Sequence, residues 1–221
     1  MMKKNNNIIN KTPAKVAVVG AAKSGIAAAK YFRSIGSDVF ISDTCSRERL
    51  DEILGENNLI DEVKSEAGRH SEKILECELV ILSPGVRSDL DILKKASIKN
   101  IPVWSEMELG YRVSKAPFLA VTGSSGKSTT VSLLASAMNG AGFETVLIGN
   151  IGTPVISVTP SLSESAVVIA EVSSFQLETI DRFKPKVAAV INLMKNHLDR
   201  YDSEEEYYNA KKRITENLTR Q

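Results

Sequence analysis

The sequence predicts an α/β fold made of two mostly parallel sheets, each flanked by helices. Short apolar runs alternate with helix-like segments along the 221 residues. Two of these runs end in glycine-rich turns that lead into helices, at 20–25 and 123–126. A polar, helix-breaking stretch over 114–117 separates the two halves. The predicted division is a disordered tail over 1–14, a Rossmann-like domain over 15–114, and a second α/β domain over 118–221.

Composition excludes several classes of protein. The chain is 43% apolar, and its 28 basic and 27 acidic residues give a net charge of +1. This balance gives no general attraction to nucleic acid or to membrane surfaces. Cys45 and Cys77 have no paired spacing, which favours a reducing compartment. Because no apolar run approaches the length of a membrane span, we expect a cytoplasmic protein.

The first elements form a β-α-β unit. Buried strands are predicted over 15–19 and 39–42, with a helix over 26–35 between them. Ala22 stands where a dinucleotide fingerprint has glycine, although Asp43 lies near the position of its ribose-binding acid. The pattern is therefore weak for NAD and fair for some nucleotide, and a tight turn without ligand remains the alternative.

The rest of the first half repeats this alternation. A charged, helix-rich segment spans 47–76, and a strand over 79–82 ends in Ser83-Pro84-Gly85. The carboxyl end of a parallel strand is a favoured ligand position, although a plain strand-ending turn fits equally well. The remaining predicted elements are a helix over 90–96, a strand over 101–104 and a helix over 106–113, with Ser105 as N-cap and Glu108 in a capping box.

A phosphate-binding loop opens the second half. A strand over 118–121 precedes it, and a helix over 130–138 follows. Backbone N–H groups of such a loop converge on phosphate oxygens, and Lys127 would reach the outer phosphates. The loop is shortened, because Val121 stands at the first glycine position, and a Gly/Ser-rich turn is the alternative. The predicted nucleotide-binding residues are Gly123, Ser124, Ser125, Gly126, Lys127, Ser128 and Thr129.

The later strands carry further polar groups at their ends. Strands are predicted over 145–148, 167–172 and 187–192, and a helix with Ser203 as N-cap runs to 218. Glu171 lies inside an apolar run, where a carboxylate is costly unless it is paired or binds metal. The alternative is an edge-strand acid that faces solvent.

The ordered motifs resemble the Mur ligases of peptidoglycan synthesis. They are Gly-Ser-Ser-Gly-Lys-Ser-Thr-Thr from Gly123, Gly149-Asn150-Ile151-Gly152, the segment from Glu171 to Glu178, His197-Leu198-Asp199-Arg200-Tyr201, and Ala210-Lys211-Lys212-Arg213-Ile214. Ser-Ser-Phe-Gln-Leu-Glu is most similar to the branch that adds D-glutamate to UDP-N-acetylmuramoyl-L-alanine. The resemblance implies an ATP-dependent amide ligase that works through an acyl phosphate. A kinase or GTPase of the phosphate-loop class would leave the later motifs unexplained.

The resemblance also implies roles for individual residues. Lys127, His197 and Lys211 would be catalytic, and Mg²⁺ would be held by Ser128 or Thr129, Glu171, His197 and a carbamylated Lys211. The first domain would bind the uridine diphosphate of the substrate through Ser24, Gly25, Asp43, Thr44, Ser83, Pro84 and Gly85. The muramoyl part would contact Asn150, Ser173 and Gln176.

The sequence departs from the family pattern in three places. Cys45 and Ser46 precede Arg47, and Lys195-Asn196 stands before His197 where acidic residues are usual. The chain ends at Gln221, before the family's third domain. We expect either a fragment or a natural truncation, monomeric and unable to ligate unaided. The alternative is a truncated, non-catalytic module that binds nucleotide or the UDP-muramoyl ligand.

Overall fold

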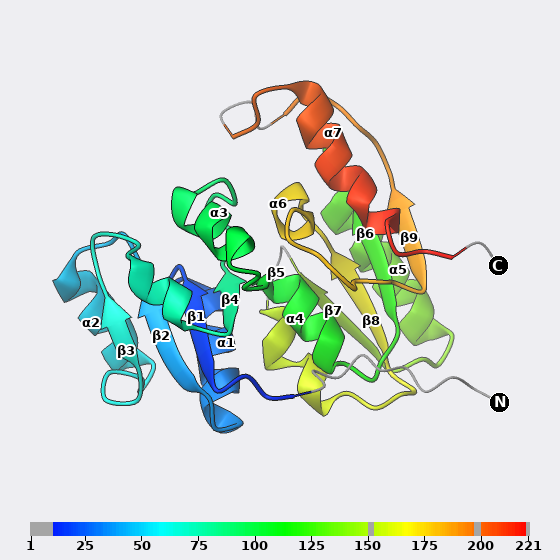
Figure 1. Cartoon of the computed structure of the whole chain (residues 1–221). Helices are drawn as coiled ribbons and strands as arrows, with labels where there is room; N and C mark the ends of the chain where they lie inside the picture. Colours follow the sequence, from blue (N-terminus) through cyan, green and yellow to red (C-terminus); the bar gives the residue numbers. More distant parts are fainter. Residues whose placement is uncertain (1–10, 150–152, 197–199, 220–221) are drawn as a thin grey trace.

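Two parallel sheets lie side by side in the computed structural model, which describes residues 11–149, 153–196 and 200–219. The first has five strands in the order β3-β2-β1-β4-β5, and the second has four in the order β7-β8-β6-β9 (Figure 1). All the paired strands are parallel, so their carboxyl ends meet at one edge of each sheet. The predicted α/β class is confirmed.

The strands of the first sheet alternate with helices along the chain. Its strands are β1 (Lys15–Val19), β2 (Asp38–Ser42), β3 (Lys64–Glu66), β4 (Leu79–Leu82) and β5 (Val103–Ser105). The accompanying helices are α1 (Lys23–Ser34), α2 (Arg47–Glu56), the 3₁₀ helix η1 (Glu72–Glu76), α3 (Asp91–Ile98) and α4 (Glu106–Val113).

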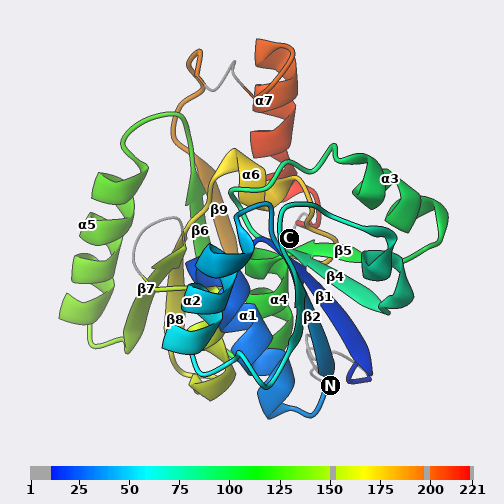
Figure 2. The same ribbon diagram turned by 90° about the vertical axis from the view of Figure 1, so that its left-hand side faces the viewer.

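The second sheet follows the same plan. Its strands are β6 (Phe118–Thr122), β7 (Thr145–Gly149), β8 (Val167–Glu171) and β9 (Val187–Val190). The helices are α5 (Lys127–Gly140), η2 (Val155–Ser157), η3 (Thr159–Ser161), α6 (Ser174–Leu177), α7 (Glu204–Lys212) and η4 (Arg213–Thr215). Helix α5 covers the side of this sheet that faces away from the first sheet (Figure 2). Among the described residues, no helix has the length and apolar character to cross a bilayer.

Several element boundaries differ from the sequence prediction, two of them near the candidate site, and one strand was not predicted. Helix α5 begins at Lys127 rather than at 130, because Gly126 itself adopts the left-handed conformation that starts the helix. Helix α7 ends at Lys212 and passes into a 3₁₀ turn rather than running to 218. Strand β3 was not predicted, since its three residues are all polar and carry no apolar signal.

Helix α4 packs into both hydrophobic cores. Its Leu109 belongs to the core that α1 forms with the first sheet, whereas Met107 and Tyr111 belong to the core of the second sheet. All three side chains are buried. The domain limits at 114 and 118 remain a prediction, since the helix before them contributes to both sides.

Glu108 fixes α4 to the second sheet rather than closing a capping box. Ser105 Oγ accepts a hydrogen bond from the Glu108 N–H at 3.2 Å, as expected of an N-cap. The Glu108 carboxylate instead accepts the backbone N–H groups of 181–183 and the Arg112 Nε–H, the last at 2.6 Å. The capping-box prediction was wrong because a distant loop supplies more donors than the local N-cap.

Candidate nucleotide and substrate site

The loop between β6 and α5 presents a helix N-terminus at the carboxyl edge of the second sheet. Gly126 is the N-cap of α5 with φ 78°, a conformation that favours glycine. A Cβ on Gly123 would lie 2.5 Å from Ile191 Cγ1, so that glycine permits close packing against the segment after β9. The partial positive charge of the helix end favours an anion at this position.

Asn192 holds this loop in place. Its Oδ1 accepts the backbone N–H groups of Ser124 and Ser125, both at 2.9 Å, and its Nδ2 donates to the Ser125 carbonyl at 2.8 Å. Sequence reasoning did not single out Asn192. The signal available was a polar side chain at the end of an apolar strand.

Two lysines meet at one carbonyl oxygen below the loop. Lys127 Nζ donates to the Gly123 carbonyl at 3.0 Å, and Lys211 Nζ donates to the same oxygen at 2.9 Å. Lys211 comes from α7, is 2% exposed, and lies 4.6 Å from the ring centroid of Tyr207. Burial, together with the charge of Lys127, lowers the pKa of Lys211 to about 8.

An oxygen pair lies beside these lysines. Ser128 Oγ donates to Glu171 Oε2 at 2.8 Å, and Glu171 is 2% exposed. Strand β8 lies between β7 and β6, so the alternative of an edge-strand acid facing solvent is wrong. Hydroxyl and carboxylate oxygens are the ligands that Mg²⁺ prefers, so the donor set fits this ion. Within residues 11–149, 153–196 and 200–219, no three His, Cys, Asp or Glu side chains gather into a fuller metal cluster.

The remaining residues predicted for this half fall into two groups. Ser173 and Gln176 form a capping box at α6, in which Gln176 Oε1 accepts the Ser173 N–H at 2.9 Å. Thr129 is exposed on the first turn of α5. Asn150 and His197 lie outside the described residues.

The first sheet has its own polar edge. Asp43 Oδ2 accepts the Ala21 N–H at 2.6 Å and Oδ1 accepts the Cys45 N–H at 2.8 Å, so this acid ties together the turns after β1 and β2. Burial raises the pKa of Asp43, but these two N–H donors outweigh it and the net shift is downward. The lowered pKa favours the ionised carboxylate, and both of its oxygens already accept hydrogen bonds from the protein backbone.

The turn after β4 packs against the turn after β1. Ser83 Oγ donates to the Gly20 carbonyl at 2.8 Å. A Cβ on Gly25 would lie 1.9 Å from the same carbonyl oxygen, so only glycine fits there. The predicted substrate residues of this sheet thus converge on one edge, with Ser24 and Pro84 partly exposed and Thr44 and Gly85 exposed.

His70, to which the sequence assigned no role, lies at this edge as well. Its Nδ1 is 2.8 Å from Ser42 Oγ, and Ser42 in turn donates to Glu66 Oε1 at 2.8 Å. Ser42 is the last residue of β2 and directly precedes Asp43. Burial lowers the pKa of His70, which favours the neutral imidazole.

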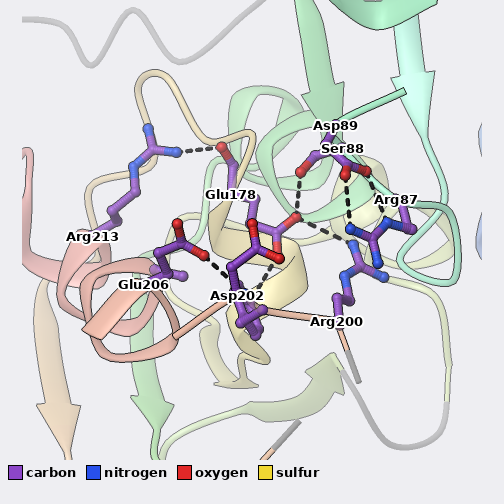
Figure 3. A pocket seen from close by; sticks show the side chains of 10 residues that line it. Arg87, Ser88, Asp89, Glu178, Arg200, Asp202, Glu206 and Arg213 are labelled. Carbon is purple, nitrogen blue, oxygen red and sulfur yellow. Dashed lines mark hydrogen bonds and ion pairs between the residues drawn. The ribbon is translucent and has the colours of Figure 1, made fainter. Parts of the chain in front are cut away.

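A pocket of about 390 Å³ lies at the junction of the two sheets (Figure 3). Its charged side chains mostly bind one another: Arg87 pairs with Asp89 at 2.7 Å, and Arg200 pairs with Glu178 at 3.2 Å. The pocket is lined by Arg87, Ser88, Asp89, Glu178, Arg200, Tyr201, Asp202, Glu206, Ala210 and Arg213.

Comparisons with known proteins divide the chain between two family models. The Mur ligase MurD-like N-terminal domain matches residues 14–105, and the Mur ligase middle domain matches residues 121–221. A UDP-N-acetylmuramoylalanine–D-glutamate ligase of Clostridioides difficile is 38% identical over 206 residues, which cover 93% of this chain and 46% of that protein. A ligase of the same name from Thermoanaerobacter pseudethanolicus is 43% identical over 209 residues, covering 92% of this chain and 45% of that protein. The chain therefore spans a little under half the length of these relatives.

Solved structures agree at the level of the fold. UDP-N-acetylmuramate:L-alanyl-gamma-D-glutamyl-meso-diaminopimelate ligase of Neisseria meningitides matches with a TM-score of 0.56 and 18% identity, over 93% of this chain and 68% of that one. UDP-N-acetylmuramate-alanine ligase of Thermotoga maritima matches with a TM-score of 0.52 and 24% identity, over 92% of this chain and 47% of that one. At such identities the likeness is one of architecture.

Proposed function

Because this chain belongs to the Mur ligase family, we propose that it carries the substrate- and nucleotide-binding parts of an ATP-dependent ligase that joins D-glutamate to UDP-N-acetylmuramoyl-L-alanine. The names of the relatives support both substrates. The structural observation that carries the proposal is the meeting of Lys127 and Lys211 at the Gly123 carbonyl, beside the Ser128–Glu171 pair.

The phosphate loop is proposed to bind ATP. In the proposed reaction the substrate carboxylate takes the γ-phosphoryl group, and the amine of D-glutamate then displaces phosphate from the acyl phosphate. Transfer between two anions needs charge neutralisation and alignment more than covalent assistance. Lys127, the first residue of α5, supplies a positive charge next to the loop over 123–126. Its role is to offset the charge on the outer phosphates.

Mg²⁺ is proposed to bind at Ser128 or Thr129 together with Glu171, with His197 and Lys211 completing a second position. When bound, the ion would neutralise phosphate oxygens and orient them. The support is the buried Glu171 carboxylate, whose Oε2 already accepts the Ser128 hydroxyl at 2.8 Å.

Lys211 is proposed to be carbamylated. Its ammonium is buried and shares a carbonyl with the Lys127 ammonium, an arrangement of like charges that burial makes costly. Attack of the neutral amine on CO₂, with loss of one proton, would make an anionic carbamate and turn this repulsion into attraction. Incubation with ¹³C-labelled CO₂ should give one carbamate carbon signal that is absent in Lys211→Ala. A spectrum identical for the two proteins would contradict the modification.

The first sheet is proposed to hold the uridine diphosphate. The supporting feature is the convergence of the turns after β1, β2 and β4 on one edge. The proposed contacts are Ser24, Gly25, Asp43, Thr44, Ser83, Pro84 and Gly85 for the diphosphate part, and Asn150, Ser173 and Gln176 for the muramoyl part. We also propose domains over 15–114 and 118–221, a cytoplasmic monomer, and no binding to nucleic acid or membrane.

Ligand-induced thermal stabilisation tests this function. The melting temperature should rise with magnesium ATP and with UDP-N-acetylmuramoyl-L-alanine, and should not rise with NAD. Stabilisation by NAD with no response to the muramoyl nucleotide would refute the proposal. An ATP-dependent ligation assay then separates an active ligase from a module that only binds.

A further inference from the structure

Arg200 joins the two sheets at the turn that follows β4. Its Nη1 donates to the Pro84 carbonyl at 3.2 Å, and its Nη2 donates to the Val86 carbonyl at 3.0 Å. Arg200 follows β9 of the second sheet, whereas the 83–86 turn belongs to the first sheet. One guanidinium therefore donates hydrogen bonds to two carbonyls of a turn that lies more than a hundred residues earlier in the chain.

Glu178 holds Arg200 in this position (Figure 3). Its Oε2 accepts from Arg200 Nη2 at 3.2 Å and from Ser88 Oγ at 2.6 Å, and its Oε1 accepts the Tyr201 hydroxyl. The side chains of Glu178 and Arg200 are each only 12% exposed, so solvent screens their pairing far less than that of a surface pair.

The guanidinium is also fixed from its flat side. It stacks on the Phe175 ring, with Cζ 3.9 Å from the ring centroid, and Phe175 in turn stacks with Tyr201 at 6.0 Å. A planar guanidinium that is stacked and bonded to three acceptors has little freedom to rearrange. The cluster therefore behaves as a rigid connection between the sheets rather than as an open ligand site.

We propose that Arg200, held by Glu178, is a positioning residue that fixes the 83–86 turn relative to the phosphate loop and so sets the span across which the substrate binds. The inference rests on the proposed function, in which the turn contacts the uridine diphosphate and the phosphate loop contacts ATP. A ligand that spans both sheets depends on their spacing, whereas a ligand bound to one sheet does not. The turn keeps its own anchors without Arg200, since Ser83 Oγ bonds Gly20 and the Val86 N–H bonds the Ser83 carbonyl at 2.9 Å.

Calorimetric titration of the whole chain with three ligands tests the inference. In Arg200→Ala, the Kd of UDP-N-acetylmuramoyl-L-alanine should rise about tenfold or more, because misplacement of one anchor is costly for a spanning ligand. The Kd values of UDP and of magnesium ATP should change by less than about twofold, because each touches one sheet only. Arg200→Lys should recover part of the loss, since lysine keeps the charge but not the paired donors.

Arg87→Ala is the matched control. Arg87 lines the same pocket, but its ion pair among the described residues is with Asp89 and its side chain is 48% exposed, so its loss should leave all three Kd values unchanged. An Arg200→Ala variant that weakens UDP as much as the muramoyl nucleotide, or that weakens neither, overturns the positioning role.

A ligand-free measurement keeps this result separate from the proposed function. Spin labels on Cys45 and on Ser136→Cys, in a Cys77→Ala background, report the distance between the sheets. Arg200→Ala should broaden the distance distribution, and Arg87→Ala should not. An unchanged distance distribution in Arg200→Ala would refute the positioning role, whatever the ligand titrations show. Failure of the unaltered chain to bind the muramoyl nucleotide would instead refute the proposed function.

Discussion

Replacing Glu106 by glutamine should make the protein more stable at alkaline pH and leave it almost unchanged at acidic pH. Glu106 is the first residue of α4 and is 1% exposed. Its Oε1 accepts the Ile156 N–H at 2.6 Å, so the side chain caps the short helix η2 inside the protein. Burial raises its pKa from 4.5 to about 7, although the N–H donors of η2 act in the opposite direction.

The direction of the effect follows from proton uptake. Between about pH 4.5 and pH 7, Glu106 is protonated in the folded chain and ionised in the unfolded chain. Its contribution to stability is therefore complete below about pH 4.5, declines as the pH rises, and is lost above about pH 7. A difference of this size in pKa corresponds to roughly 3 kcal/mol in the free energy of unfolding.

Urea unfolding from pH 5 to pH 8.5 measures this contribution. Glutamine does not ionise, so the difference in unfolding free energy between Glu106→Gln and the unaltered chain isolates one group. The variant should gain roughly 2–3 kcal/mol relative to the unaltered chain across this range. Glu164→Gln, at an exposed loop position, is the control and should show no such trend. A difference that stays constant with pH for Glu106→Gln would refute the reasoning.

Three other substitutions give sharp outcomes. Gly25→Ala should lower the melting temperature strongly, since its Cβ would lie 1.9 Å from the Gly20 carbonyl oxygen. Lys127→Ala should abolish stabilisation by magnesium ATP while leaving that by UDP intact, as measured by thermal shift. Glu108→Ala should cost about 3 kcal/mol or more in urea unfolding, because it leaves the backbone N–H groups of 181–183 and the buried Arg112 Nε–H without their acceptor, so that Asp181 becomes the only ion-pair partner of Arg112 among the described residues.

Controls for the first two substitutions replace a residue of the same type on another helix. Gly55→Ala, where an added Cβ meets nothing within 4 Å, should retain the melting temperature. Lys30→Ala, exposed on α1, should leave the response to ATP unchanged. Full binding of ATP by Lys127→Ala, or ordinary stability of Glu108→Ala, would contradict the roles assigned to these side chains.

The sequence predicted the alternation of strands and helices well, because buried parallel strands have a simple apolar signature. The runs predicted over 15–19 and 167–172 were located from their apolar residues alone, and they correspond to β1 and β8. Strand β3 was missed because its pairing with β2, rather than the apolar character of its own residues, makes this segment a strand. The capping-box pattern also gave a wrong prediction at Glu108. Whether its carboxylate binds the local N-cap or the distant loop over 181–183 depends on tertiary packing.

The candidate site was predicted only in part, because some of its residues belong to local sequence motifs and others do not. Lys127, Glu171 and Lys211 carry motifs in the sequence, and the structure brings them to one carbonyl and its surroundings. Arg200 and Asn192 contact loops that lie far from them in the chain, so no local pattern reveals their partners. Their contacts arise only when the two sheets and their connecting turns are assembled.

Helix α4 has a practical consequence for dividing this chain. The two matched family segments end at 105 and begin at 121, and α4 lies in the interval between them. A piece that starts at 118 leaves holes where Met107 and Tyr111 fill the second core, and a piece that stops at 105 loses Leu109 from the first. A chimera that exchanges either half with a relative should therefore keep α4 together with the residues that pack against it in both cores. Otherwise the mismatched helix will leave a cavity in one of the two cores.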